Sequence, residues 1–185
     1  MAKRIIEGVS EHVILPIEGR GLDVGCGSGA LAIAVAKLNP QAEVVGVDRW
    51  GMDYASYSKT LCEQNAQAEG VVNVVFAEGD ALQLDFEDES FDAVFSNYVY
   101  HNIRSKNRQD ILLETLRVLK KGGLFVIHDI FSWANYGDMQ QFLRQLKEMG
   151  YERAELINTT EGIFMSKWEA SWMMLDGSAI LVGKK

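Results

Sequence analysis

Cysteine, proline and long apolar runs are scarce in this sequence, and these scarcities exclude several classes of protein. Cys26 and Cys62 are the only cysteines and lack a CxxC spacing, so we expect no disulfide-built scaffold and a reduced, cytoplasmic setting. No apolar run approaches the roughly 20 residues that a membrane span needs. Residues 1–19 also lack the continuous apolar core of a signal peptide.

Positive charge is in short supply as well. The chain has 18 lysines and arginines against 26 aspartates and glutamates, which gives a formal net charge of −8. An acidic chain repels phosphate backbones, so we expect a small-molecule substrate and no nucleic acid. The length of 185 residues and the 48% hydrophobic content fit one globular domain over residues 1–185.

What the sequence has instead is a regular alternation of strand-like and helix-like segments. A short amphipathic helix is expected within residues 1–19, over 3–14. Strands are predicted at 21–24, 43–47, 73–77, 91–96 and 124–129, with later short strands in "RAELIN" and "SAILVGKK". Helices are predicted between most of them, at 30–38, 54–69, 106–119 and 138–149. This alternation is typical of a three-layer, doubly wound α/β (Rossmann-like) fold with a mostly parallel sheet.

Capping signals set the expected helix ends. Asp53 and Ser105 are plausible N-cap residues, because their side chains can accept hydrogen bonds from the first turn. The stretch from Lys120 to Gly123 reads as a basic last turn followed by glycine, which is typical of a helix end.

The stretch "GLDVGCGSGA" is a glycine-rich turn between a predicted strand and a predicted helix. Residues Gly25 to Ala30 satisfy the pattern G-x-G-x-x-G/A, and Asp48 stands where a ribose-binding acid is expected. Glycines in such a turn let the backbone approach a ligand closely. The match indicates a nucleotide-like ligand and leaves its class open.

Two acidic positions narrow the class of ligand. Asp23 precedes the turn by two residues, where it would repel a pyrophosphate but attract a ligand that carries an ammonium and a sulfonium group. Asp80, followed by Ala81, comes after the third strand, where a carboxylate can accept from an adenine amino group.

Taken together, the sequence resembles the class I S-adenosylmethionine-dependent methyltransferases. The resemblance is carried by "LDVGCGSG", "VVGVDRW", "EGDALQL", "FDAVFSNYVYHNI" and "LRVLKKGGLFVIHD", in the family's order and at its usual intervals. These segments lie between Gly21 and Asp129. The resemblance implies a seven-stranded sheet with an antiparallel last strand, and S-adenosylmethionine as the cofactor.

The resemblance also implies a role for each cofactor-binding position. The methionine part would be held by Asp23 and the turn residues Gly25, Cys26, Gly27 and Gly29. Asp48 would bind the ribose, and the adenine would lie among Arg49, Trp50, Asp80 and Ala81. Asn97 and Tyr98 would lie near the methionine amino group and the departing methyl. Cys26 is interpreted as a small residue that fits the turn rather than as a nucleophile, because no base accompanies it.

Residues after the fourth strand are the candidates for catalysis. Tyr98, Tyr100 and His101 follow the strand end, where side chains line the crevice of such a sheet. Histidine is a common general base near neutral pH, so His101 is a candidate base for an acidic hydroxyl or thiol, but a packed, hydrogen-bonded histidine fits equally well. His128 and Asp129 could contribute to a metal site, but no third ligand has suitable spacing, so no metal is predicted.

Residues 160–177 are unusually rich in tryptophan and methionine. Phe164, Trp168, Trp172 and Leu175 share one helical stripe, which predicts packing on the core or against a second subunit. The alternative is a lid over an apolar substrate pocket, and a homodimer is left open.

The sequence as a whole predicts transfer of a methyl group from S-adenosylmethionine to a small-molecule acceptor by in-line displacement, with S-adenosylhomocysteine as product. Two alternatives stay open. One is an NAD(P)-dependent oxidoreductase, because the glycine pattern is shared with dinucleotide-binding proteins. The other is a non-catalytic protein that keeps the fold and the cofactor.

Overall fold

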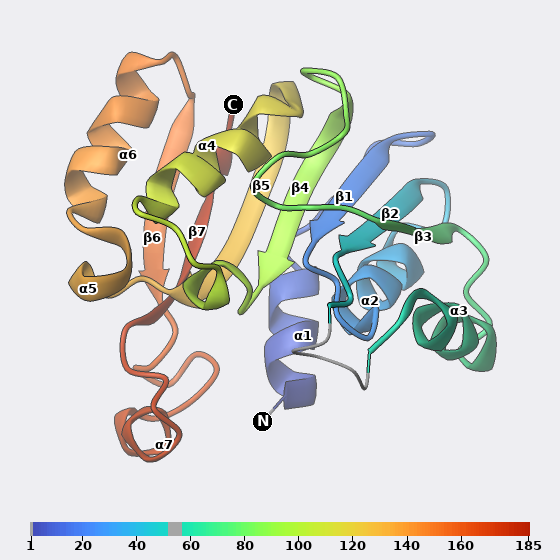
Figure 1. Ribbon diagram of the computed structural model, residues 1–185, viewed down its shortest axis with the longest axis horizontal. Helices are drawn as coiled ribbons and strands as arrows, with labels where there is room; N and C mark the ends of the chain where they lie inside the picture. The colour runs from blue at the N-terminus through green and yellow to red at the C-terminus, as the bar shows by residue number, and fades with distance from the viewer. Residues whose placement is uncertain (1, 52–56) are drawn as a thin grey trace.

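A seven-stranded sheet forms the centre of the molecule in a computed structural model that describes residues 2–51 and 57–185 (Figure 1). Its strands lie in the order β3-β2-β1-β4-β5-β7-β6. They are β1 (Arg20–Val24), β2 (Glu43–Asp48), β3 (Val74–Glu78), β4 (Phe91–Asn97), β5 (Leu119–Ile130), β6 (Arg153–Asn158) and β7 (Ser178–Lys184).

The helices cover both faces of this sheet. They are α1 (Ala2–Ser10), α2 (Ala30–Leu38), α3 (Lys59–Ala68), α4 (Arg108–Arg117), α5 (Trp133–Tyr136), α6 (Met139–Glu148) and α7 (Lys167–Trp172), with the short 3-10 helix η2 (Tyr100–Asn102). Helices α1, α2, α3 and α7 contribute to the hydrophobic core on one face, and α4, α5 and α6 to the core on the other. The three layers of the predicted fold are therefore present.

Strand directions agree with the predicted fold class. The pairs formed by β1, β2, β3, β4 and β5 are parallel, whereas β7 is antiparallel to both of its neighbours, β5 and β6. Strands covered on both faces are expected to be almost wholly apolar. Val24, Phe95 and Ile127 follow this rule, since each side chain is fully buried. The doubly wound prediction with an antiparallel last strand is confirmed.

Two of the predicted helix ends are wrong. Helix α4 begins after Asn107, not at Ser105, because the Asn107 side chain accepts a hydrogen bond from the backbone N–H of Gln109 at 3.1 Å. The stretch from Lys120 to Gly123 lies inside β5, not at a helix end, where it forms an irregularity in the pairing with β4. Helix α3 is capped by Ser58, and the predicted cap Asp53 lies outside the described residues.

The tryptophan-rich segment 160–177 does not form the single helical stripe that was predicted. Ser166 and Glu169 form a capping box that starts α7 only at residue 167, so Phe164 precedes the helix. Phe164 is buried in the core, whereas Trp168 and Trp172 are 74% and 77% exposed. The two indole rings stack at 5.8 Å between centroids. The prediction that this segment packs on the core is therefore correct for Phe164 but not for Trp168 and Trp172.

Candidate functional site

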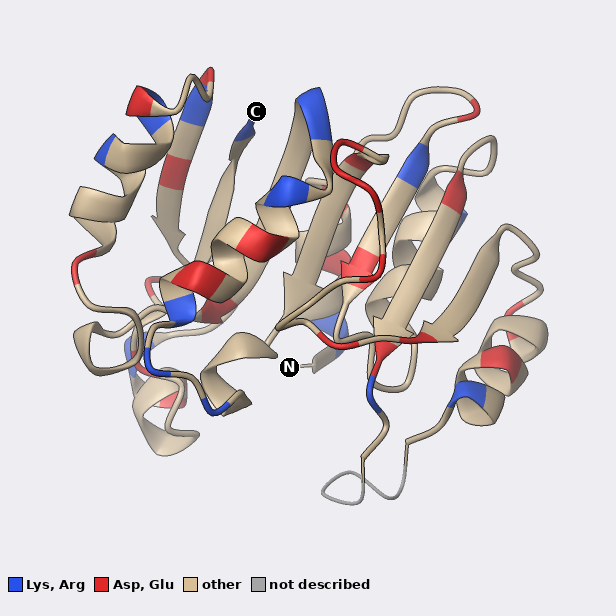
Figure 2. Cartoon of the chain, turned by 45° about the horizontal axis from the view of Figure 1, so that its top comes forward, with Lys and Arg blue, Asp and Glu red and all other residues tan. Residues whose placement is uncertain are grey.

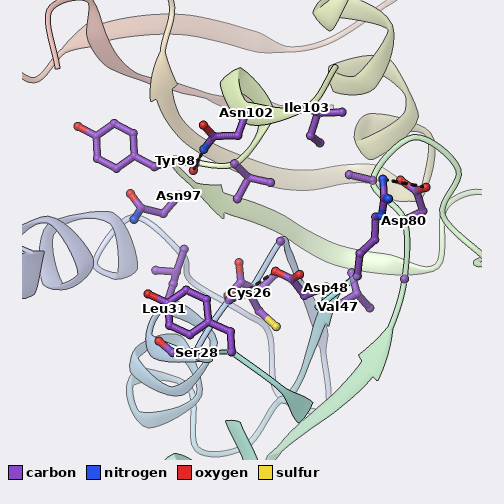
Figure 3. Close-up of a pocket in the computed structure, with 18 of the residues that line it drawn as sticks. Cys26, Ser28, Leu31, Val47, Asp48, Asp80, Asn97, Tyr98, Asn102 and Ile103 are labelled. Carbon is purple, nitrogen blue, oxygen red and sulfur yellow. Dashed lines mark hydrogen bonds and ion pairs between the residues drawn. The ribbon is translucent and has the colours of Figure 1, made fainter. Parts of the chain in front are cut away.

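A cavity of about 740 Å³ opens at the carboxyl ends of β1, β2 and β4, next to the loop that follows β3 (Figure 3). This is where ligands bind in open α/β sheets, at the point where the strand order reverses. Its lining residues come from the segments 23–31, 47–51, 79–82 and 97–104, with Ile6 of α1 and Tyr57 before α3. The cavity therefore joins all the sequence segments that carry the predicted cofactor residues.

The glycine turn between β1 and α2 forms one wall of this cavity. Gly25 has a φ of 75°, and a side chain there would bring Cβ within 2.3 Å of Cγ1 of Val99. Gly27 has a φ of 56°, and the nearest atom to its Cβ position is 3.9 Å away, so this backbone is open to a ligand. Glycine is needed at position 25 because a side chain would clash with Val99, and at position 27 because a ligand can then approach the backbone closely.

Asp23 presents an unsatisfied carboxylate oxygen at the cavity. The residue is only 1% exposed, and its Oδ2 atom has no hydrogen-bond partner among the described residues. Burial raises the pKa of this carboxyl to about 8, because the charged form is poorly solvated. A buried polar atom without a partner is rare in folded proteins, so a ligand that brings a positive donor fits this position.

Asp48, at the end of β2, is fixed by backbone donors from two loops. Its Oδ2 atom accepts from the N–H of Gly27 and its Oδ1 atom from the N–H of Trp50, both at 2.9 Å. A carboxylate oxygen can accept more than one hydrogen bond. The carboxylate is therefore oriented in the cavity and keeps lone pairs for two further donors, such as vicinal hydroxyls.

Among the expected adenine contacts, Arg49, Asp80 and Ala81 line the cavity together. The Arg49 guanidinium lies 3.8 Å from the Asp80 carboxylate, although both side chains are largely exposed. Trp50 does not line the cavity. Its indole N–H donates to the carbonyl of Gly27 at 2.9 Å, so the ring supports the glycine turn.

Asn97 and Tyr98, at the end of β4, both line the cavity. Oδ1 of Asn97 lies 2.8 Å from Nδ1 of His128, which occupies the paired position on β5. Tyr98 has a φ of 56°, and its hydroxyl lies 2.8 Å from Oγ of Ser178. Burial raises the pKa of the Tyr98 hydroxyl. Left-handed backbone at a non-glycine residue is typical of functional sites.

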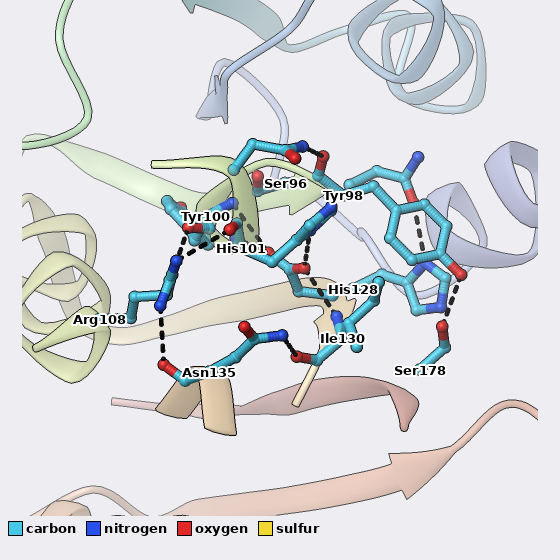
Figure 4. A network of polar contacts seen from close by, with 12 residues as sticks. Ser96, Tyr98, Tyr100, His101, Arg108, His128, Ile130, Asn135 and Ser178 are labelled. Atoms are coloured by element: carbon cyan, nitrogen blue, oxygen red, sulfur yellow. Dashed lines mark hydrogen bonds and ion pairs between the residues drawn. The ribbon is translucent and has the colours of Figure 1, made fainter. Parts of the chain in front are cut away.

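Tyr100 and His101 do not line the cavity. They belong to a network of polar contacts beside it (Figure 4). Tyr100 is fully buried, its hydroxyl lies 2.9 Å from the hydroxyl of Thr115, and burial raises its pKa. Nδ1 of His101 lies 2.5 Å from a carboxylate oxygen of Asp129. Tyr100 is thus enclosed in the core, whereas His101 keeps a partly exposed ring edge-on to Tyr98 at 6.1 Å.

Asp129 is a residue whose role sequence reasoning missed. It is fully buried and accepts hydrogen bonds from the N–H of Tyr100 at 2.8 Å and from the hydroxyl of Tyr136 at 2.9 Å, besides its contact with His101. Arg108 donates to the carbonyls of Tyr100 and His101. These bonds fix the turn after β4. The acid at the end of β5 was visible in the sequence, but Tyr100 and His101 lie 29 and 28 residues before it, and Tyr136 lies on the separate helix α5.

Cys26 is part of the glycine turn, and Cys62 on α3 contacts it. Cys26 lines the cavity, and Cys62 donates to the carbonyl of Gly27 at 3.2 Å. Both are free and buried.

Within the described part of the chain, no cluster of three histidine, cysteine, aspartate or glutamate side chains could hold a metal ion. Nor does any helix of that part have the length and apolar character needed to cross a bilayer.

Comparison with known proteins gives one family and several relatives. The family model described as "Methyltransferase domain" matches residues 18–175. The chain is 37% identical over 108 residues to a demethylmenaquinone methyltransferase of Geobacillus kaustophilus (strain HTA426), covering 58% of this chain and 43% of that protein. It is 30% identical over 146 residues to the sterol 24-C-methyltransferase erg6 of Aspergillus fumigatus, covering 77% of this chain and 37% of that protein. The chain thus spans less than half the length of these curated relatives.

Solved structures share the fold at lower identity. The [4+2]-cyclase SpnF superposes with a TM-score of 0.72 at 21% identity, covering all of this chain and 81% of that one. The phosphoethanolamine N-methyltransferase 2 of Haemonchus contortus, bound to S-adenosylhomocysteine, gives a TM-score of 0.70 at 18% identity, covering all of this chain and 52% of that one. The first of these is named for a cyclisation, so the fold alone does not determine the reaction.

Proposed function

Since the chain belongs to the class I S-adenosylmethionine-dependent methyltransferase family, we propose that it transfers a methyl group from this cofactor to a small-molecule acceptor. The observation that carries the proposal is the unpaired Oδ2 atom of Asp23 beside the open glycine turn. A dinucleotide would bring pyrophosphate to this turn, and pyrophosphate offers no positive donor to the unpaired oxygen of Asp23. The ammonium group of S-adenosylmethionine satisfies the same oxygen.

We assign the cofactor to the wall formed by the glycine turn and the three acids. Asp23 would accept from the ammonium group, and Gly25–Gly29 would let the methionine part approach the backbone. Asp48 would accept from the ribose hydroxyls, and Arg49, Asp80 and Ala81 would surround the adenine. Trp50 is better assigned to support of the turn, since its N–H bonds to Gly27.

The bound cofactor supplies an already activated methyl group, so the protein's own contribution is positioning, exclusion of water and removal of a proton. Tyr98 lines the cavity and would orient the acceptor. His101 lies outside the cavity lining but edge-on to Tyr98, so as general base it would take the proton at Nε2 from an acceptor that extends past Tyr98, with Asp129 holding Nδ1. Tyr100 is withdrawn as a catalytic candidate, because its hydroxyl is buried against Thr115.

We infer a largely apolar acceptor. Among the lining residues that the cofactor assignment does not use, Ile6, Leu31, Val99 and Ile103 are apolar, and Asn102 and Arg104 are polar. Two relatives are named for a quinone and a sterol reaction, which supports the same class. The net charge of −8 disfavours a nucleic-acid acceptor. A cytoplasmic location is part of the proposal and is supported by the two free cysteines.

We further propose that a second copy of the chain covers α7. Trp168 and Trp172 expose about three-quarters of their surface, roughly 370 Å² together if a tryptophan has about 250 Å². That is nearly half of the roughly 800 Å² that each partner contributes to a standard interface. Met173, Met174 and Ile163 add further exposed apolar surface in the same segment.

The test of the proposed function is calorimetry with S-adenosylhomocysteine and with NAD⁺. We expect binding of the first only, and at least tenfold weaker binding by Asp48→Asn, because a hydrogen bond to a charged group is worth about 1.5–3 kcal/mol. Asp85→Asn, in an exposed loop away from the cavity, is the matched control. Binding of NAD⁺ alone would favour the oxidoreductase. Binding of S-adenosylhomocysteine without label transfer to any acceptor in cell extract would favour a non-catalytic protein.

A further inference from the structure

A buried chain of polar side chains runs from the cavity wall to the segment before α7. Asn97 lines the cavity, and its Oδ1 atom lies 2.8 Å from Nδ1 of His128, which Figure 4 labels. Nε2 of His128 lies 3.1 Å from the hydroxyl of Thr159. His128 and Thr159 are both fully buried. No bulk water reaches these atoms, so the network has to satisfy itself.

The positions of the hydrogen-bonding protons in this network can be assigned from one residue to the next. A neutral imidazole has one donor nitrogen and one acceptor nitrogen, and an amide oxygen can only accept. Oδ1 of Asn97 therefore requires a proton on Nδ1 of His128. Nε2 then has to accept, and the hydroxyl of Thr159 is the donor within reach.

The alternative use of the Thr159 hydroxyl is less favourable. The carbonyl of Ser178 lies 3.0 Å from this hydroxyl, but it already accepts from the backbone N–H of Thr159 at 3.1 Å. If the hydroxyl donated to Ser178, Nε2 of His128 would need the proton and Nδ1 would face an amide oxygen at 2.8 Å, lone pair against lone pair. An imidazolium is disfavoured too, because burial lowers the pKa of His128 to about 4.

We propose that His128, as its neutral Nδ1–H tautomer, is a positioning residue that turns the Asn97 amide so that its N–H groups face the cofactor cavity. Nδ2 of Asn97 has no hydrogen-bond partner among the described residues. It can donate to a carboxylate but cannot accept from an ammonium group. Asn97 therefore faces the carboxylate of the cofactor's amino-acid end, and Asp23 is left to the ammonium group. This inference rests on the proposed function.

The tautomer is tested directly by NMR of the ligand-free protein labelled with ¹⁵N at histidine. We expect a protonated, pyrrole-type Nδ1 and an unprotonated, pyridine-type Nε2 for His128 at pH 7. The His128→Asn variant assigns the signal. An Nε2–H tautomer, or an imidazolium at pH 7, would overturn the proposal.

The consequence for binding is tested with two ligands that differ only at the amino-acid end. His128→Leu removes the Nδ1 donor, so S-adenosylhomocysteine should bind roughly three- to tenfold more weakly, whereas 5′-methylthioadenosine, which lacks the carboxylate, should bind as before. His128→Asn should retain affinity for both, because its amide N–H replaces Nδ1–H. If neither ligand binds the unaltered protein, the proposed function fails. If both bind and His128→Leu changes their affinities equally or not at all, the inference about Asn97 fails.

Discussion

The stability of the ligand-free protein depends on pH through the carboxyl group of Asp23. Burial raises the pKa of its carboxyl from 3.8 to about 8, so the folded chain binds this proton more tightly than the unfolded chain does. Its contribution to stability is complete below the unfolded pKa and is lost as the pH rises through about 8. The same burial that prepares the carboxylate for a cationic ligand therefore makes the empty protein less stable in mild alkali.

Asp23→Asn should remove this pH dependence, because the amide carries no ionisable proton. Relative to the unaltered protein, the variant should gain on the order of 2–4 kcal/mol of unfolding free energy between pH 5 and pH 8.5. Urea denaturation at both pH values measures the difference. An equal difference at the two pH values would contradict the raised pKa.

Gly25→Ala should be costly for two separable reasons. The left-handed backbone with φ of 75° costs an alanine about 1–2 kcal/mol, and the new methyl would meet Cγ1 of Val99 at 2.3 Å. Gly122→Ala is the matched control, because Gly122 has a φ of 77° and nothing within 4 Å of its Cβ position. We expect Gly25→Ala to lose about 1–3 kcal/mol more than the control in thermal or urea unfolding. Equal losses would mean that Val99 moves aside without cost.

At the scale of single residues, the sequence predicts the location of side chains at strand ends better than the location of side chains in turns. Asp23, Asp48 and Asn97 could be placed at the cavity because parallel strands bring their carboxyl ends to one edge. Trp50 and Tyr100 could not, because each follows a strand in an irregular turn where alternation no longer gives the direction of a side chain. Their partners, the carbonyl of Gly27 and the hydroxyl of Thr115, are visible only in three dimensions.

At the scale of elements, periodicity predicted which segments are helices and strands, but local competition between caps moved their ends. Ser105 precedes a proper cap, and its hydroxyl instead bonds to the backbone of Asn107. The stretch Lys120–Gly123 has the composition of a helix end but lies inside β5, because Leu119 before it and Leu124 after it both pair with β4. Pairing of strands thus overrides a local glycine signal.

Helix α7 carries a prediction of its own about assembly. Replacing Trp168 and Trp172 by alanine should convert a dimer to a monomer in light scattering coupled to gel filtration, because the stacked rings form the centre of the proposed contact. The control is Val72→Ala, which removes a 94% exposed side chain beside β3, at the opposite edge of the sheet from β6. A monomer before substitution, or a dimer after it, would count against the proposal.

At the scale of the whole molecule, the doubly wound fold class followed from the alternation of strands and helices. This alternation permits few other arrangements, and crossovers of one hand reduce them further, whereas the seven strands and the antiparallel last strand followed only from the family resemblance. The exposure of Trp168 and Trp172 was harder to predict, because it depends on where helix α7 begins. The sequence therefore predicted the cavity's location and the acids around it, but not the hydrogen bonds that orient them.

The position of β7 has a consequence for how the protein is made. This strand is the seventh in chain order, yet it lies between β5 and β6. During synthesis on the ribosome, β6 leaves the exit tunnel before β7 and finds no neighbour to pair with, while the outer side of β5 stays open. A chain that stops before Ser178 would leave the outer side of β5 and both sides of β6 unpaired, so completion of β7 protects the protein against aggregation.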